Sequence, residues 1–123
     1  MGQALIQLLI ALALAGGETH AGYAPHYAPG LMNKVAARRG LEPAACMVSS
    51  PRYPVGAWVY VWGVDTKVLR HCLVADVSHP AHRAGHLARG IEVELSYENA
   101  REVCGETTGP SRDCPIVVYK LNE

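Results

Sequence analysis

Two stretches of the chain decide its fold: Cys72-Leu-Val-Ala-Asp-Val-Ser-His-Pro-Ala-His-Arg83 and Gly90-Ile-Glu-Val-Glu-Leu-Ser96. In the first, an aliphatic run ends at a carboxylate and a loop rich in histidine follows. In the second, aliphatic residues alternate with glutamates, which predicts a strand with one buried face. Asp76 is therefore expected where a strand opens into a loop, a position that suits a working acid or base.

The same periodicity predicts further elements on both sides. Strands are expected at residues 55–62, 68–77, 91–95 and 116–121, each bounded by turn residues. Short helical segments are expected at residues 31–39, ended by Gly40 and Pro43, and at residues 97–103. Many short strands with little helix predict an all-β fold, a small six-stranded barrel or sandwich with one or two short helices.

Residues 1–21 differ from the rest of the chain. A short apolar run at residues 4–15 is followed by Gly16 and Gly17 and then by the small residues Thr19 and Ala21. This pattern predicts a signal peptide cleaved after Ala21. The run is too short for a membrane anchor, which needs about 20 apolar residues.

Residues 22–123 are then expected to form one small domain with a single core. The whole chain has 11 basic and 11 acidic residues, spread along its length. Such a balance gives no basic groove for nucleic acid and no polybasic patch for a membrane surface.

The chain has four cysteines, Cys46, Cys72, Cys104 and Cys114. In a small exported domain an even number favours disulfides over metal ligation. Three pairings are possible. We favour Cys104 with Cys114 and Cys46 with Cys72, each bridge adding about 2 to 4 kcal/mol.

Several motifs occur in a recognisable order: Gly22-Tyr-Ala-Pro-His-Tyr27, Tyr53-Pro-Val-Gly-Ala-Trp-Val-Tyr-Val61, Cys72-Leu-Val-Ala-Asp76, Arg89 ahead of Val93-Glu-Leu-Ser96, and Gly105. This order resembles the double-psi β-barrel superfamily of rare-lipoprotein-A-like, expansin and barwin-like domains. The resemblance covers the whole predicted mature chain. It implies a six-stranded double-psi β-barrel that acts on cell-wall glycan.

The resemblance also implies site residues. Asp76 matches the strand-end aspartate that acts as acid/base in the glycan-cleaving members, and Glu94 matches the aspartate of their Asp-Leu-Ser motif. Tyr23, His26 and Tyr27 match the N-terminal segment and are expected to bind substrate. This chain departs from those members after Asp76, where Val77-Ser78-His79-Pro80 replaces their Arg-Gly-Pro-Phe.

The expected reaction needs a proton delivered to the glycosidic oxygen. A lytic transglycosylase manages with one carboxyl, and Asp76 would serve if partial burial raised its pKa. An inverting hydrolase needs a second carboxylate about 6.5 to 9.5 Å away, for which Glu94 and Glu92 are candidates. The structural alternative is that Asp76 only accepts backbone hydrogen bonds at a strand end.

Four histidines, His71, His79, His82 and His86, lie near Asp76 in sequence. Their spacing suggests a zinc site only on a regular helix, and Pro80 and Gly85 argue against one. We therefore expect a solvated loop with no metal, in which His79 or His82 assists Asp76. Arg83 or Arg89 would pair with a substrate carboxylate or with Glu94, although a surface ion pair is the plainer interpretation.

One further pattern is the aromatic face of residues 55–62, formed by Trp58, Tyr60 and Trp62. These rings would either stack on sugar rings or lie beneath residues 23–27. We favour the second arrangement, because a bare aromatic stripe on a secreted monomer promotes aggregation.

Three functional hypotheses remain. The first is a secreted or periplasmic enzyme that cleaves peptidoglycan or another cell-wall polysaccharide through Asp76, without a cofactor. The second is a non-catalytic module that binds glycan or protein. The third is a disulfide-stabilised effector or defence protein.

Overall fold

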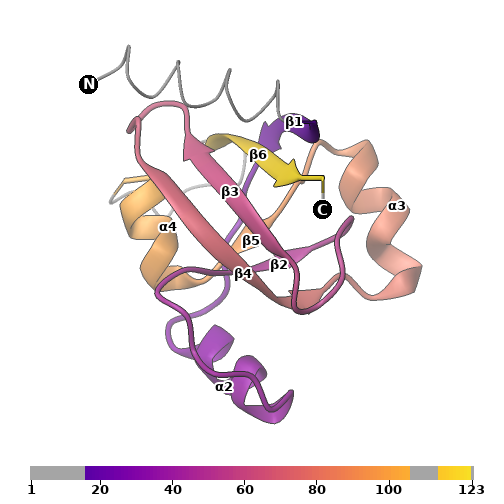
Figure 1. Cartoon of the computed structure of the whole chain (residues 1–123), viewed down its shortest axis with the longest axis vertical. Coiled ribbons are helices and arrows are strands. Elements are labelled where there is room, and N and C mark those ends of the chain that lie inside the picture. The colour runs from indigo at the N-terminus through magenta and orange to yellow at the C-terminus, as the bar shows by residue number, and fades with distance from the viewer. Residues whose placement is uncertain (1–15, 106–113, 123) are drawn as a thin grey trace.

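The structure, a computed structural model, describes residues 16–105 and 114–122. It is mostly sheet, with six strands bent into a half-barrel and three short helices among the described residues (Figure 1). The elements in chain order are β1 Gly17–Tyr23, α2 Leu31–Arg38, β2 Met47–Ser50, β3 Trp58–Gly63, β4 Leu69–Val77, α3 Pro80–Ala88, β5 Glu94–Leu95, α4 Tyr97–Val103 and β6 Pro115–Leu121.

The strand order is β1-β6-β3-β4-β2-β5. All neighbours are antiparallel except β2 and β4, which run parallel. Two isolated parallel bridges, Tyr23 to Ile91 and His26 to Leu95, connect the chain around the end of β1 with the chain around β5. The two ends of the sheet are thus brought together by the N-terminal segment that follows β1.

The concave side of the sheet holds the main core. Val59 and Val61 of β3 are fully buried there, together with Val74 of β4 and Leu95 of β5. A second, smaller core lies on the other side, where Met32 and Ala36 of α2 pack against Met47 and Ala75. The strands β2 and β4 therefore contribute to two separate apolar clusters, one on each face.

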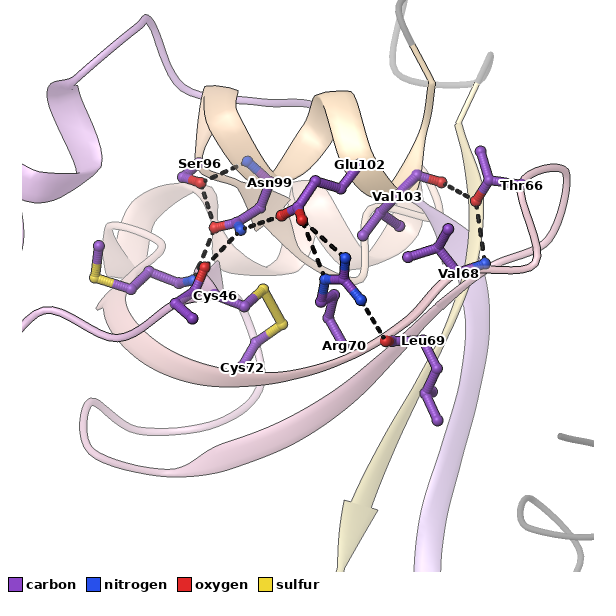
Figure 2. A network of polar contacts seen from close by, with 12 residues as sticks. Cys46, Thr66, Val68, Leu69, Arg70, Cys72, Ser96, Asn99, Glu102 and Val103 are labelled. Carbon is purple, nitrogen blue, oxygen red and sulfur yellow. Dashed lines mark hydrogen bonds and ion pairs between the residues drawn. A yellow bond between two sulfur atoms is a disulfide. The ribbon is translucent and has the colours of Figure 1, made fainter.

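Helix α4 is fastened to the sheet by the buried side chain of Asn99 (Figure 2). Its Oδ1 accepts hydrogen bonds from the backbone N–H of Met47 at 3.0 Å and from the hydroxyl of Ser96. Its Nδ2 donates to the carbonyl of Ala45 and to Glu102 Oε1, both at 2.8 Å. One amide thus satisfies polar groups on three segments.

The disulfide prediction is confirmed. Cys46 is bonded to Cys72, with their Cα atoms 4.5 Å apart, and Cys104 to Cys114, with 5.0 Å between Cα atoms. The first bridge joins the residue before β2 to β4, and the second joins the end of α4 to the residue before β6.

The predicted solvated histidine loop is wrong, because Pro80–Ala88 forms helix α3. Proline at the first helical position loses no hydrogen bond and has a backbone angle suited to a helix. The ring of His79 caps the helix by accepting from Ala81 N–H at 3.1 Å. Gly85 costs the helix about 1 kcal/mol relative to alanine, which the remaining residues tolerate. The helix brings the described total to three, one more than expected.

Strand β1 was not predicted. It pairs with β6 over seven residues, from Gly17 opposite Leu121 to Tyr23 opposite Pro115. Cleavage after Ala21 would remove residues 17–21, which make five of these seven pairs. None of the helices in the described part of the chain has the length and apolar character needed to cross a bilayer.

The aromatic face of β3 is not covered by residues 23–27, which pair with the chain around β5 instead. Trp58 is 43% exposed. The ring of His71, on the neighbouring strand β4, lies 4.9 Å from that of Trp58 and stacks on Tyr60 at 4.4 Å. A cross-strand histidine, rather than the N-terminal segment, thus packs against these rings.

Candidate functional site

A β-bulge in β4 sets the direction of Asp76. Val48 of β2 is paired with Val74, but the next residue, Ser49, is paired with Asp76, so Ala75 is the extra residue. Val74 and Val77 both pack in the main core, whereas Ala75 packs in the small outer core. Without the bulge, Asp76 would follow the alternation of the strand into the main core. The bulge places it on the outer face beside α2.

Ser49 lies between two carboxylates. It is paired with Asp76 of β4 on one side and with Glu94 of β5 on the other. Cross-strand partners share a face of the sheet, so Asp76, Ser49 and Glu94 form a row on one surface. Two strand spacings put the Cα atoms of the two acids about 9.5 Å apart. The predicted pair of carboxylates is therefore assembled by three adjacent strands.

Asp76 is held by three hydrogen bonds. Tyr27 donates its hydroxyl to Oδ2 at 2.7 Å, and Arg39 Nη2 and the backbone N–H of Val77 donate to Oδ1 at 2.5 and 3.0 Å. Burial alone raises the pKa of Asp76, but these donors and the charge of Arg39 outweigh it, so the pKa is lowered. The condition for Asp76 to act as the acid, a raised pKa, is not met.

Glu94 shows the opposite behaviour. Burial raises its pKa, the charge of His86 opposes this, and the charge of Asp76 adds to it, leaving the pKa above its usual value. Tyr27 lies near both acids, and burial together with the charges of Asp76 and Glu94 raises its pKa as well. A pair of carboxyl groups with pKa values pushed apart is typical of an acid and a base with separate roles.

Asp76 lines an open hollow of about 260 Å³ together with Val35, Arg38 and Arg39 of the α2 region. Side-chain exposure is 19% for Asp76 and 41% for Arg39. The carboxylate is therefore partly exposed to solvent and lines a concave surface, as a substrate-binding group must.

His86 is the histidine that reaches the site. Its Nδ1 lies 2.8 Å from the hydroxyl of Ser78, which is buried just after β4, and its charge acts on Glu94. The helical periodicity of α3 carries His86 back toward the sheet, whereas His79 caps the helix and His82 is exposed. In the described part of the chain neither His79 nor His82 hydrogen-bonds to Asp76, and the histidine whose charge acts on a carboxyl group of this row is His86, on Glu94.

The other predicted site residues have partners other than Asp76. Tyr23 is exposed and bridges to Ile91, and the Nδ1 of His26 lies 3.0 Å from the carbonyl oxygen of Tyr27. Arg89 ends α3 as its C-cap and is exposed. The alternative carboxylate, Glu92, is buried in an ion pair with Arg52 at 3.1 Å.

Arg83 lines a different hollow of about 160 Å³ beside Tyr53 and Val77. Of the residues expected to bind substrate, all within the described part of the chain, Tyr27 is the one that hydrogen-bonds to Asp76.

Four residues of the site were missed: Arg38, Arg39, Ser49 and Ser78. The sequence shows two consecutive arginines, Arg38 and Arg39, at the end of a predicted helix, but it does not show that Asp76 is the partner of Arg39. Ser49 and Ser78 gave no signal, because their positions in the site follow from strand pairing and from the packing of α3 back toward the sheet.

No group of three metal-ligating side chains comes together among residues 16–105 and 114–122. The ring centroids of His79 and His82 are 5.7 Å apart, and those of His82 and His86 are 6.3 Å apart.

Comparison with known proteins adds no assignment. No model of a protein family matches the chain. No curated protein matches it at a significant level.

Proposed function

We propose that this protein is an exported domain of the rare-lipoprotein-A and expansin type that cleaves β-linked cell-wall glycan. The observation that carries the proposal is the row of Asp76, Ser49 and Glu94 on one face of three adjacent strands. Its two acids have pKa values shifted in opposite directions. The parallel pairing of β2 and β4 and the bridges of the N-terminal segment to β5 support a closed double-psi barrel as its fold.

In the proposed reaction Glu94, rather than Asp76, is the general acid. Its protonated carboxyl gives a proton to the glycosidic oxygen as the bond from that oxygen to the anomeric carbon breaks. Asp76, held anionic by Tyr27 and Arg39, stabilises the positive charge that develops on the sugar. A hydroxyl of the same sugar closes the ring and returns its proton to Glu94, so no water is consumed.

We also propose that the protein is exported, but with a cleavage site different from the one expected after Ala21. Because residues 17–21 form most of β1, the mature chain should keep them. Ala13 and Ala15 provide the small-residue pattern of a cleavage site just ahead of this strand. Mass spectrometry of protein secreted by an expressing cell should give a mature start at Gly16, whereas a start at Gly22 would contradict the change.

The second candidate is a non-catalytic module that binds glycan. It is favoured by the ion pair between Arg39 and Asp76 and by the three donors on that carboxylate, which would equally serve a purely structural aspartate. In this case Asp76 would help hold α2 against the sheet and would take no part in chemistry.

Incubation of the purified protein with glycan strands separates the two candidates. Turnover should release anhydro-sugar ends, which mass spectrometry detects as products lighter by one water than hydrolysis products. Glu94→Gln should abolish release while retaining binding. Binding by the unchanged protein with no products at any pH would instead support the module.

A further inference from the structure

The hollow beside Asp76 is lined on one side by a strongly basic helix. Residues 31–39 contain Lys34, Arg38 and Arg39 and no acidic residue. The chain as a whole carries equal numbers of basic and acidic residues, so this is a local concentration of positive charge. Two of these cations, Arg38 and Arg39, line the hollow itself.

The charges inside the hollow do not cancel. Arg39 is paired with Asp76, with 2.5 Å between Nη2 and Oδ1. Arg38 lines the same space and has no carboxylate partner among the described residues. The four lining residues therefore carry two positive charges and one negative charge, which leaves one guanidinium free to bind an anion.

Helix α2 fixes the backbone from which this guanidinium extends. Met32 and Ala36 are fully buried against Met47 and Ala75, so the helix is anchored to the outer face of the sheet. Arg38 is in the last helical turn, where a positive charge is favoured by the helix dipole. The exposed side chain of Arg38 thus extends from an anchored backbone at the edge of the hollow.

We propose that Arg38 binds a carboxylate carried by the substrate, so that the glycan this protein acts on is an acidic one. A guanidinium matches the planar carboxylate with two parallel hydrogen bonds. The hollow carries one unpaired positive charge, which matches a single carboxylate. Its volume of about 260 Å³ is below the range of about 300 to 1,000 Å³ typical of sites that hold a whole ligand. A hollow of this size suits one substituent of a sugar, with the sugar ring outside it.

This inference rests on the proposed function, because it assigns the substrate class of the same site. Arg38 is the specificity-determining residue in it, while Asp76 and Glu94 keep the roles given above. Arg83 and Arg89, expected from the sequence to meet a substrate carboxylate, lie on α3 and at its end, outside the hollow.

The test compares two ligands that differ only in the carboxylate. Peptide-free glycan strands are used as prepared and after reduction of their carboxyl groups to alcohols, and dissociation constants are measured by calorimetry with the Glu94→Gln chain, which prevents turnover. We expect reduction to weaken binding about tenfold, a change equal to about 1.4 kcal/mol. Arg38→Gln in the same background should weaken binding of the acidic strands about tenfold and leave binding of the reduced strands unchanged.

Arg83→Gln is the matched control, and it should leave both constants unchanged. Equal binding of native and reduced strands would overturn the proposal, as would an Arg38→Gln effect of the same size on both ligands. The outcome is separate from that of the proposed function. Loss of carboxylate preference with products still released refutes the acidic subsite alone, whereas carboxylate-dependent binding without any products refutes the catalytic role alone.

Discussion

Two polar clusters lie on the sheet, one around Asn99 and one around Asp76. They contain similar side chains but differ in their burial and in their pKa shifts. Around Asn99 the central amide is buried, its oxygen and nitrogen both have hydrogen-bond partners, and it joins α4 to the chain before β2 (Figure 2). Around Asp76 the groups are half-exposed, and two carboxyl groups lie near each other with pKa values shifted apart. A satisfied buried network stabilises a fold, whereas an open cluster with opposed titrations is suited to chemistry.

The largest effect is expected at the open cluster. Glu94→Gln removes the proposed proton donor while keeping the shape of the side chain, and should lower the rate of glycan cleavage about 10² to 10⁴-fold. The same change should stabilise the protein at pH 7. Since the folded pKa of Glu94 is raised, its protonated form stabilises the fold at low pH, and this contribution is lost as the pH rises through that pKa.

Initial rates and urea unfolding at pH 7 check both parts of this prediction. Glu42→Gln, an exposed change outside the site, is the control. A variant that cleaves at the normal rate would remove Glu94 from the mechanism.

The next effect is expected at the buried cluster. Asn99→Ala leaves the buried N–H of Met47 without a partner and removes the hydrogen bond to the carbonyl of Ala45, which is an exposed residue. An unsatisfied buried group costs about 1 to 3 kcal/mol, so we expect a loss of about 1 to 3 kcal/mol in the free energy of unfolding, measured with urea. A loss below about 0.5 kcal/mol would mean that the Asn99 network adds little to stability.

A smaller effect is expected from Tyr27→Phe, which removes one donor from Asp76. One hydrogen bond to a charged group is worth about 1.5 to 3 kcal/mol when buried, and partial exposure reduces this to about 1 kcal/mol. Since the folded pKa of Asp76 is lowered, its anion stabilises the fold above the unfolded pKa of about 3.9, and this is lost as the pH falls through the folded value.

The change should therefore reduce the difference in unfolding free energy between pH 7 and pH 2. Urea titrations of both proteins at the two pH values measure it. An unchanged difference would show that Tyr27 does not act on Asp76.

The smallest effect is expected at the edge of the buried cluster. Arg70 pairs with Glu102 at 2.8 Å, but both side chains are about two-fifths exposed. Exposed ion pairs contribute about 0 to 1 kcal/mol, so Arg70→Gln should change the unfolding free energy by less than about 1 kcal/mol. A larger loss in urea unfolding would show that the network extends from Asn99 to the surface.

The sequence predicted those parts of the fold that depend on local pattern. The alternation in β3 and the cysteine pairs were predicted correctly, and so was the helix from Leu31 that Gly40 follows. Strand β1 was missed because residues 17–21 look like the end of a leader, and only pairing with β6 makes them a strand. Helix α3 was missed because Pro80 and Gly85 were treated as helix breakers, although proline at the first position is favourable.

The positions of the two acids, Asp76 and Glu94, on neighbouring parts of the sheet were predictable, but the surroundings that shift their pKa values were not. The place of Asp76 at a strand end is a local feature, and its position was predicted. Its direction depends on a bulge opposite Ser49, and its protonation depends on Arg39, whose sequence separation from Asp76 is 37 residues. Neither a bulge nor a distant ion pair leaves a pattern in one sequence, so sequence reasoning assigned proton donation to Asp76, whereas we propose that Glu94 donates the proton.

The most direct test of this account is the titration of the two carboxyl groups by carbon-detected NMR of the folded protein. We expect Glu94 to titrate above the usual glutamate value of about 4.3 and Asp76 below the usual aspartate value of about 3.9. Titration of Asp76 above Glu94, or of both groups at their usual values, would contradict it.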